Sequence, residues 1–89
     1  MATIFVRHAV ADYDVWKPGF DEHQRMRRQY GLVDAGLYRG VDDPNDVTVI
    51  VTTDDVARAQ DFLASDDLRE TMGRLGVTAA PEIWITEKA

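Results

Sequence analysis

The only two histidines of the chain, His8 and His23, carry the side chains best suited to move a proton near neutral pH. Two arginines, Arg27 and Arg39, could stabilise the anion that forms when such a proton leaves a substrate. Other common catalytic groups are missing, since the chain has no cysteine and helix capping explains its single serine, Ser65. The two histidines and two arginines are therefore the predicted catalytic residues.

The spacing of the polar residues argues against most cofactors. No HxH or HxxxH pair and no cysteine are available for a metal, and no glycine-rich phosphate loop is present. A serine triad is excluded as well, because the one serine is used at a helix start. We therefore expect no metal and no other cofactor, and any chemistry would depend on histidine, arginine, tyrosine, tryptophan and carboxylate side chains.

A helical pattern over residues 16–30 places two of these candidates on an otherwise apolar side. At about 100° per residue, one stripe holds Trp16, Gly19, Phe20, His23, Met26, Arg27 and Tyr30. Because charged groups are rarely buried without a partner, His23 and Arg27 indicate a polar cavity on the inner side of the helix. In the structural alternative, Arg27 extends to the edge of the helix and His23 is a core histidine with satisfied hydrogen bonds.

The other two candidates lie on predicted strands. His8 ends the first strand, on the same side as Ile4 and Val6, where it could border a ligand cleft or be an ordinary surface residue. Tyr38 and Arg39 are neighbours on the second strand, so they must face opposite sides of the sheet. One would face the helices and the other a partner subunit, and the alternative for Arg39 is an ion pair with an acidic residue.

Aromatic side chains are the candidates for the apolar wall of a substrate pocket. They are Trp16, Phe20, Tyr30 and Trp84. Aromatic rings supply large apolar area, and tyrosine and tryptophan add one polar atom each. For Trp84, in the last predicted strand, core packing is the alternative.

Length and charge limit the architecture and the partners. The 89 residues are enough for one domain, residues 1–89, and the net charge is −6. An acidic surface repels nucleic acid and anionic lipid, so neither is an expected partner. No charged segment followed by an apolar run opens the chain, so we expect no signal peptide and a cytoplasmic location.

The hydrophobic pattern predicts the order strand, helix, strand, strand, helix, helix, strand. The expected strands are residues 3–8, 32–41, 47–53 and 82–86, with a hairpin turn at residues 42–46 and a bulge or close approach at Gly36 and Gly40. Pro18 is expected in the first turn of the first helix. The second helix should carry Val56, Ala59, Gln60 and Leu63 on one side, and the third, capped by Ser65, should carry Leu68, Met72 and Leu75.

Two strand–helix–strand halves joined by a hairpin predict an α+β ferredoxin-like fold, a four-stranded antiparallel sheet with its helices on one face. The third strand is apolar on both sides, with Val49 on one and Ile50 on the other. Such a sheet needs cover on its second face, and a second copy of the chain would supply it. We therefore expect a homodimer.

Three stretches of the chain, spread over nearly its whole length, carry a resemblance to a known group. They are His8-x-Val10-x-Asp12-Tyr13-Asp14-x-Trp16-Lys17-x-x-Phe20-Asp21, then Tyr38-Arg39-x-x-Asp42-Asp43-Pro44-Asn45, then Ser65-x-x-Leu68 with Gly76-Val77 and Pro81. The chain thereby resembles small dimeric α/β-barrel proteins related to antibiotic-biosynthesis monooxygenases and polyketide cyclases. The resemblance implies face-to-face packing of two sheets and a pocket between sheet and helices. It also implies metal-free and flavin-free oxidation or cyclisation of phenolic polyketides, although other members degrade haem.

Two functions remain open at this point. The first is a cofactor-independent monooxygenase or cyclase that acts on a small aromatic or polyketide-like molecule. The second is a non-catalytic domain of the same fold that binds a small molecule or assembles with itself. RNA binding is disfavoured, because the charge is acidic and no run of exposed aromatic residues suits stacked bases.

Overall fold

The β-branched and aromatic runs of the chain form one antiparallel sheet in the computed structural model, which describes residues 1–89. The strands are β1 (Ala2–Ala9), β2 (Val33–Arg39), β3 (Asp46–Thr53) and β4 (Glu82–Glu87). Their order across the sheet is β2-β3-β1-β4, and every neighbouring pair is antiparallel. Each helical connection therefore joins two parallel strands across one intervening strand, which is the ferredoxin-like arrangement.

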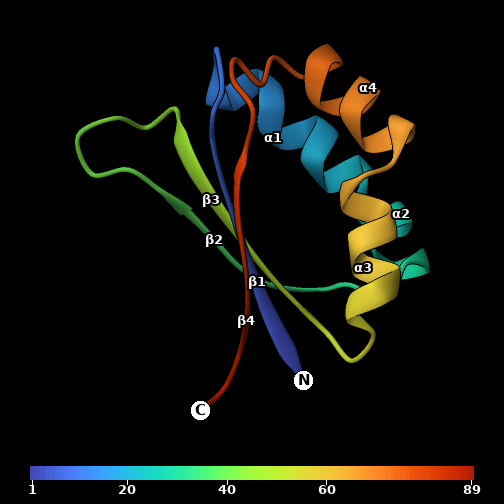
Figure 1. The fold of residues 1–89 in the computed structure, drawn as a ribbon. Coiled ribbons are helices and arrows are strands. Elements are labelled where there is room, and N and C mark those ends of the chain that lie inside the picture. The colour runs from blue at the N-terminus through green and yellow to red at the C-terminus, as the bar shows by residue number, and fades with distance from the viewer.

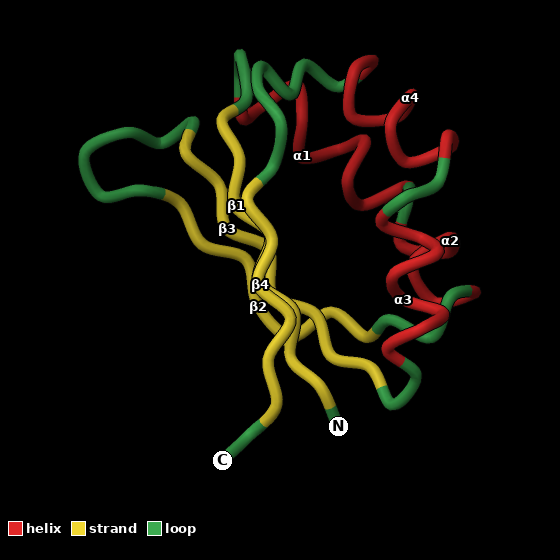
Figure 2. The backbone as a smooth tube through the Cα atoms, viewed as in Figure 1, coloured by secondary structure: helices red, strands yellow, loops and turns green.

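Four helices cover one face of this sheet (Figure 1). They are α1 (Tyr13–Glu22), α2 (Gln24–Gln29), α3 (Val56–Leu63) and α4 (Asp66–Arg74). Figure 2 shows every helix on one side of the strands and no part of the chain packed on the other side. The predicted α+β class, the four-stranded antiparallel sheet and the ferredoxin-like fold are confirmed.

The helix expected over residues 16–30, after a cap at Asp12 or Asp14, is wrong in its middle. Asp12 is the cap, since its side chain accepts a hydrogen bond from the Asp14 backbone N–H at 2.9 Å, and the helix begins at Tyr13. Pro18 therefore lies inside α1, where it removes a helical hydrogen bond, and Gly19 follows it. The helix is then interrupted at His23, where the imidazole contacts Asp67 of α4.

The starts of the later helices are confirmed, but the inner side of α3 differs from the prediction. The side chains of Asp55 and Ser65 cap α3 and α4 by accepting hydrogen bonds from backbone N–H groups. On α3 the buried residues are Ala59 and Phe62, whereas Gln60 is exposed. The buried stripe follows the apolar residues three positions apart and leaves the polar glutamine in solvent.

Alternation along the strands separates core from surface. The side chains of β1 and β3 that face the helices are buried, namely Ile4, Val6, His8, Val47, Val49 and Val51. Trp16 of α1 completes this core with 3% of its surface exposed. The apolar stripe over residues 16–30 also predicts that Phe20, one turn later, is buried deeply, and this prediction is wrong, because Phe20 is only partly buried. Trp16, rather than Phe20, is therefore the aromatic residue of α1 in the buried core.

The two predicted irregularities of the second strand are confirmed. The register of β2 against β3 shifts between Asp34 and Gly36, which is a bulge. A Cβ on Gly40 would lie 2.7 Å from the Asp43 carbonyl oxygen, so the hairpin backbone approaches closely there. The bulge matters for the site, because it pairs Asp34 with the inward-facing Val51 and so turns the Asp34 carboxylate toward the helices.

Candidate functional site

A cavity of about 80 Å³ lies between the sheet and all four helices. Its apolar lining comes from the sheet, from α1, from α3 and from the α4 segment, namely Val6, Val49, Val51, Trp16, Phe20, Leu32, Phe62, Leu63, Leu68, Met72 and Leu75. Four polar or charged residues complete the wall, namely His8, His23, Arg27 and Thr71. A concave, mainly apolar site with a few polar groups is the usual form of a small-molecule pocket.

His8 belongs to this wall and carries a polar atom without a hydrogen-bond partner. The residue is 8% exposed, and its Nδ1 is fully buried without a hydrogen-bond partner. The imidazole meets the Trp16 ring edge-on, with the ring centroids 5.6 Å apart. A buried polar atom without a partner costs about 1–3 kcal/mol, so its presence in a cavity points to a role in binding.

The environment of His8 also sets its charge. Burial lowers the pKa of His8 from its usual value of 6.5, against smaller opposing effects of its own backbone and of the Asp46 carboxylate. The imidazole is therefore neutral at pH 7, with one nitrogen able to accept a hydrogen bond and the other able to donate one. Such a group can take a proton from a hydroxyl bound in the cavity.

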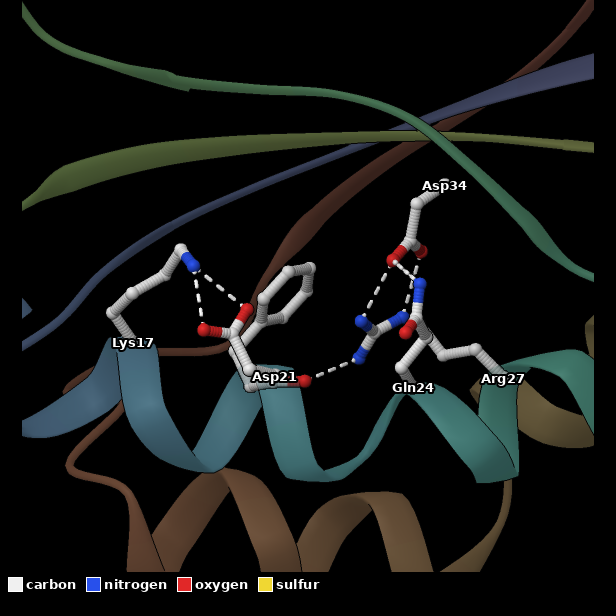
Figure 3. A network of polar contacts seen from close by, with 6 residues as sticks. Lys17, Asp21, Gln24, Arg27 and Asp34 are labelled. Atoms are coloured by element: carbon white, nitrogen blue, oxygen red, sulfur yellow. Dashed lines mark hydrogen bonds and ion pairs between the residues drawn. The ribbon is translucent and has the colours of Figure 1, made fainter.

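Arg27 also lines the cavity, but its charge is already paired (Figure 3). Its Nε and Nη2 donate hydrogen bonds to the two Asp34 carboxylate oxygens at 2.8 and 2.9 Å, and its Nη1 donates to the Phe20 carbonyl at 2.8 Å. The guanidinium also lies over the Phe20 ring, 3.8 Å from its centroid. Arg27 thus joins α2 to β2 and fixes Phe20 in the cavity wall.

His23 has a carboxylate partner as well. Its Nε2 lies 2.9 Å from an Asp67 oxygen, so this pair connects the interruption between α1 and α2 to the first turn of α4. The structure therefore brings His8, His23 and Arg27 together around one cavity. Among these three residues, only His8 has a fully buried side-chain nitrogen or oxygen without a hydrogen-bond partner.

The remaining predicted site residues lie outside this cavity. Arg39 is at the end of β2, with its guanidinium 3.7 Å from the centroid of the Tyr13 ring and its Nε donating to the Pro44 carbonyl. Tyr30 packs on Phe62, with ring centroids 5.2 Å apart, behind the lining residues. Trp84 is paired with Phe5 on the uncovered face of the sheet, because alternation along β4 directs it away from the helices.

Among the lining residues absent from the predicted site, Phe62 adds an aromatic ring and Thr71 adds a hydroxyl group. Phe62 contacts the rings of both His23 and Tyr30, and Thr71 is the one neutral hydroxyl residue of the wall. The signal for Phe62 is its position three residues after Ala59, the small residue that faces the sheet. Thr71 lies between Leu68 and Met72 on the predicted stripe of α4, so the stripe itself locates it.

A second, more polar depression lies beside the carboxyl end of β1, lined by acidic residues that include Asp43, Asp46 and Glu82. Arg7 donates hydrogen bonds to both Asp46 oxygens at 3.0 and 2.7 Å, and this contact lowers the pKa of Asp46. No group of three or more histidine, aspartate or glutamate side chains is arranged to hold a metal ion. No helix is long and apolar enough to cross a membrane.

The sheet order and the four helices on one face define the chain as an α+β protein of the ferredoxin-like class. Neither a protein-family model nor a curated protein matches its sequence. Solved structures do share its fold. A candidate antibiotic biosynthesis monooxygenase from Bordetella bronchiseptica superposes with a TM-score of 0.79 at 17% identity, over 99% of this chain and 96% of that one.

Two further solved structures extend this comparison. An antibiotic biosynthesis monooxygenase matches with a TM-score of 0.76 at 14% identity, over 100% of this chain and 99% of that one. A NIPSNAP domain protein from Burkholderia xenovorans matches with a TM-score of 0.64 at 15% identity, over 100% and 95% of the two chains. The resemblance expected from the sequence is thus confirmed at the level of the fold.

Proposed function

We propose that this chain is a cofactor-independent enzyme that acts on a small aromatic or polyketide-like molecule in the cavity between sheet and helices. The observation that carries the proposal is His8, which lines an otherwise apolar cavity and has a buried nitrogen without a hydrogen-bond partner. The names of the structural neighbours favour monooxygenation as the reaction, since two of them are described as antibiotic biosynthesis monooxygenases.

The chemistry requires little from the protein beyond a base and an enclosed site. An electron-rich phenol that loses its proton to His8 becomes a phenolate, which can react with molecular oxygen without a metal. One oxygen atom enters the ring to give a quinone and the other leaves as water, and the substrate supplies all the electrons. In the cyclase version, the same base generates an enolate that attacks a carbonyl carbon of the same molecule, and the alkoxide that forms takes the proton back from the imidazolium. Arg27 would act as a positioning residue, because it holds Phe20 in the wall through the contacts described above.

The proposal is tested by oxygen uptake with a series of electron-rich phenols after exhaustive dialysis against a chelator. We expect turnover by the dialysed protein and at least about a hundredfold loss in His8→Phe, the typical contribution of a positioned base. Arg39→Gln serves as the control, since its guanidinium lies outside the cavity. Equal activity of His8→Phe and the unmodified chain would contradict the assignment of His8.

The second candidate, a non-catalytic binding domain, is favoured by the pairing of the other charged groups. Arg27 is bound to Asp34 and His23 to Asp67, so no unpaired cation of the wall is left to stabilise an anionic intermediate. Binding of an aromatic ligand without oxygen uptake and without product would select this function over the enzyme.

We further propose that the chain forms a homodimer through the uncovered face of its sheet. On that face Phe5 lies beside Trp84 on β4, and Ile50 lies beside Phe5 on β3. Tyr38 and Val33 of β2, on the same face, are 61% and 60% exposed. Several large apolar side chains gathered on one uncovered sheet face are typical of a protein interface.

A further inference from the structure

The dimensions and charges of the cavity restrict its occupant more narrowly than the proposed function does. We infer that the cavity binds an uncharged aromatic molecule of a single ring with one hydroxyl, and that this hydroxyl forms a hydrogen bond with His8. The inference rests on the proposed function for the location of the site, but it concerns binding alone and needs no turnover.

The size of the cavity limits the ligand to one ring. A cavity that holds benzene measures about 150 Å³, and this one measures about 80 Å³. A ring can enter if flexible wall side chains such as Met72 move aside, because methionine adapts to irregular space. A second fused ring would need α4 to move away from α1.

Two contacts hold those helices together. A Cβ on Gly19 would lie 2.2 Å from a methyl group of Leu75, so α1 directly contacts the end of α4. The His23 to Asp67 pair, 2.9 Å apart, ties the carboxyl end of α1 to the first turn of α4. A ligand of two or more rings would have to break both contacts.

The charges of the wall favour a neutral ligand. Arg27 is neutralised by the two oxygens of Asp34, and the protonated form of His23 would be neutralised by Asp67. No unpaired cation of the wall is left to compensate an anionic carboxylate or phosphate, and the net charge of −6 repels both. A phenol stays neutral at pH 7, because a phenolic hydroxyl has a pKa of about 10 in water.

His8 supplies the one directional contact. Its Nδ1 is the only fully buried side-chain nitrogen or oxygen in the chain without a hydrogen-bond partner, and the rings of Trp16 and Phe20 stack beside it at 4.7 Å between centroids. A phenol ring against this pair would satisfy the imidazole with its hydroxyl. An aromatic molecule without a hydroxyl would leave that nitrogen unpaired and dry.

The test uses fluorine NMR titrations of the full chain with four probes: 4-fluorophenol, 4-fluorotoluene, 4-fluorobenzoate and 4-fluoro-1-naphthol. We expect 4-fluorophenol to bind about three- to tenfold more tightly than 4-fluorotoluene, the effect of one hydrogen bond. The benzoate and the naphthol should bind at least about tenfold more weakly than the phenol. Preference for toluene over phenol, or tighter binding of the naphthol or the benzoate than of the phenol, would overturn the inference.

Two variants locate the hydroxyl. His8→Phe keeps an aromatic ring against Trp16 and should abolish the preference for phenol over toluene, while Thr71→Val should keep it. Loss of the preference in Thr71→Val with its retention in His8→Phe would overturn the assignment of His8. If His8→Phe does not fold by circular dichroism, His8→Leu is titrated in its place with the same expected loss.

These outcomes are separate from those of the proposed function. Phenol binding that depends on His8, without oxygen uptake, would support the inference and reject the enzyme. Turnover of a multi-ring phenol without selective binding of the single-ring phenol would support the enzyme and reject the inference.

Discussion

The two faces of the sheet are made from alternate residues of the same strands, and they differ in what the chain leaves unsatisfied on each. The face under the helices is closed over Ile4, Val6 and Trp16, and its unsatisfied feature is one imidazole nitrogen. The opposite face has no cover from the chain, and its unsatisfied feature is apolar area around Trp84, which is 46% exposed. A single polar atom suits a small molecule, whereas a broad apolar area suits another protein surface.

The largest effect is expected for the residue that closes the covered face. Trp16→Ala should lower the free energy of unfolding by about 3–5 kcal/mol, because it empties the centre of the core and removes the stacking partner of Phe20. Chemical denaturation measures the loss. Val15→Ala is the control on the same helix, since Val15 is 62% exposed, and it should cost less than about 0.5 kcal/mol. Similar losses in both variants would show that Trp16 does not close the core.

Substitution of Arg27 tests whether its ion pair with Asp34 holds the helices on the covered face of the sheet. Arg27→Ala should cost about 2 kcal/mol, below the range for a fully buried pair because the Asp34 side chain is 28% exposed. Lys17→Ala, which breaks an exposed pair four residues apart with Asp21 (Figure 3), should change stability by less than about 0.5 kcal/mol. A neutral result for Arg27→Ala in thermal melts would remove the structural role of this arginine.

Self-association of the chain tests the role proposed for the uncovered face of the sheet. Light scattering at micromolar concentration should give about twice the 10.0 kDa mass of the chain, with more than about 1,000 Å² buried between the copies. Trp84→Ala should weaken the dimer by about 2 kcal/mol, or about 30-fold in Kd, as for a central aromatic of an interface. Val15→Glu, on the outer side of α1, should leave the mass unchanged. A monomer at high concentration of the unmodified chain would reject the interface.

The smallest effect concerns the charge of His8. Because burial lowers its pKa in the folded chain, the unfolded chain binds this proton more readily in the window between the folded pKa and 6.5. The free energy of unfolding should therefore rise with pH across that window and be independent of His8 above it. Denaturation at several pH values measures the slope, and His8→Phe should remove it. The Asp46 carboxylate acts on His8 electrostatically, but the pKa of Asp46 is lowered below 3.8, so its own contribution is lost only at more acidic pH.

The sequence predicts well those features that depend on local periodicity. The alternation of β1 places His8 with Ile4 and Val6, and the stripe of the first helical segment contains both Trp16 and Arg27, as the structure has them. The partners of these residues depend on contacts between distant segments. Asp34 reaches Arg27 only because a bulge turns it inward, and Asp67 meets His23 only because α4 packs on α1. Neither juxtaposition leaves a periodic signal in the sequence.

The same limit applies to the helix boundary and to Phe62. The interruption at His23 does not disturb the apolar period, so residues 16–30 show one continuous stripe although two helices form it. On α3 the choice between Gln60 and Phe62 depends on the phase of a helix of eight residues, which is too short for periodicity to fix.

The order of the strands has a consequence for how the chain folds. β1 occupies an inner position, between β3 and β4, and its pairing with β4 joins Ala2 to Glu87. During synthesis on the ribosome, one edge of β1 therefore stays unpaired until residues 82–87 have emerged, although β3 is already available to the other edge. Pairing across so much of the chain is slow, because the long intervening loop must lose conformational entropy before any stabilising contact forms. Until then the free β1 edge can accept a strand from another chain, which makes the last strand the step that protects the nascent protein from aggregation.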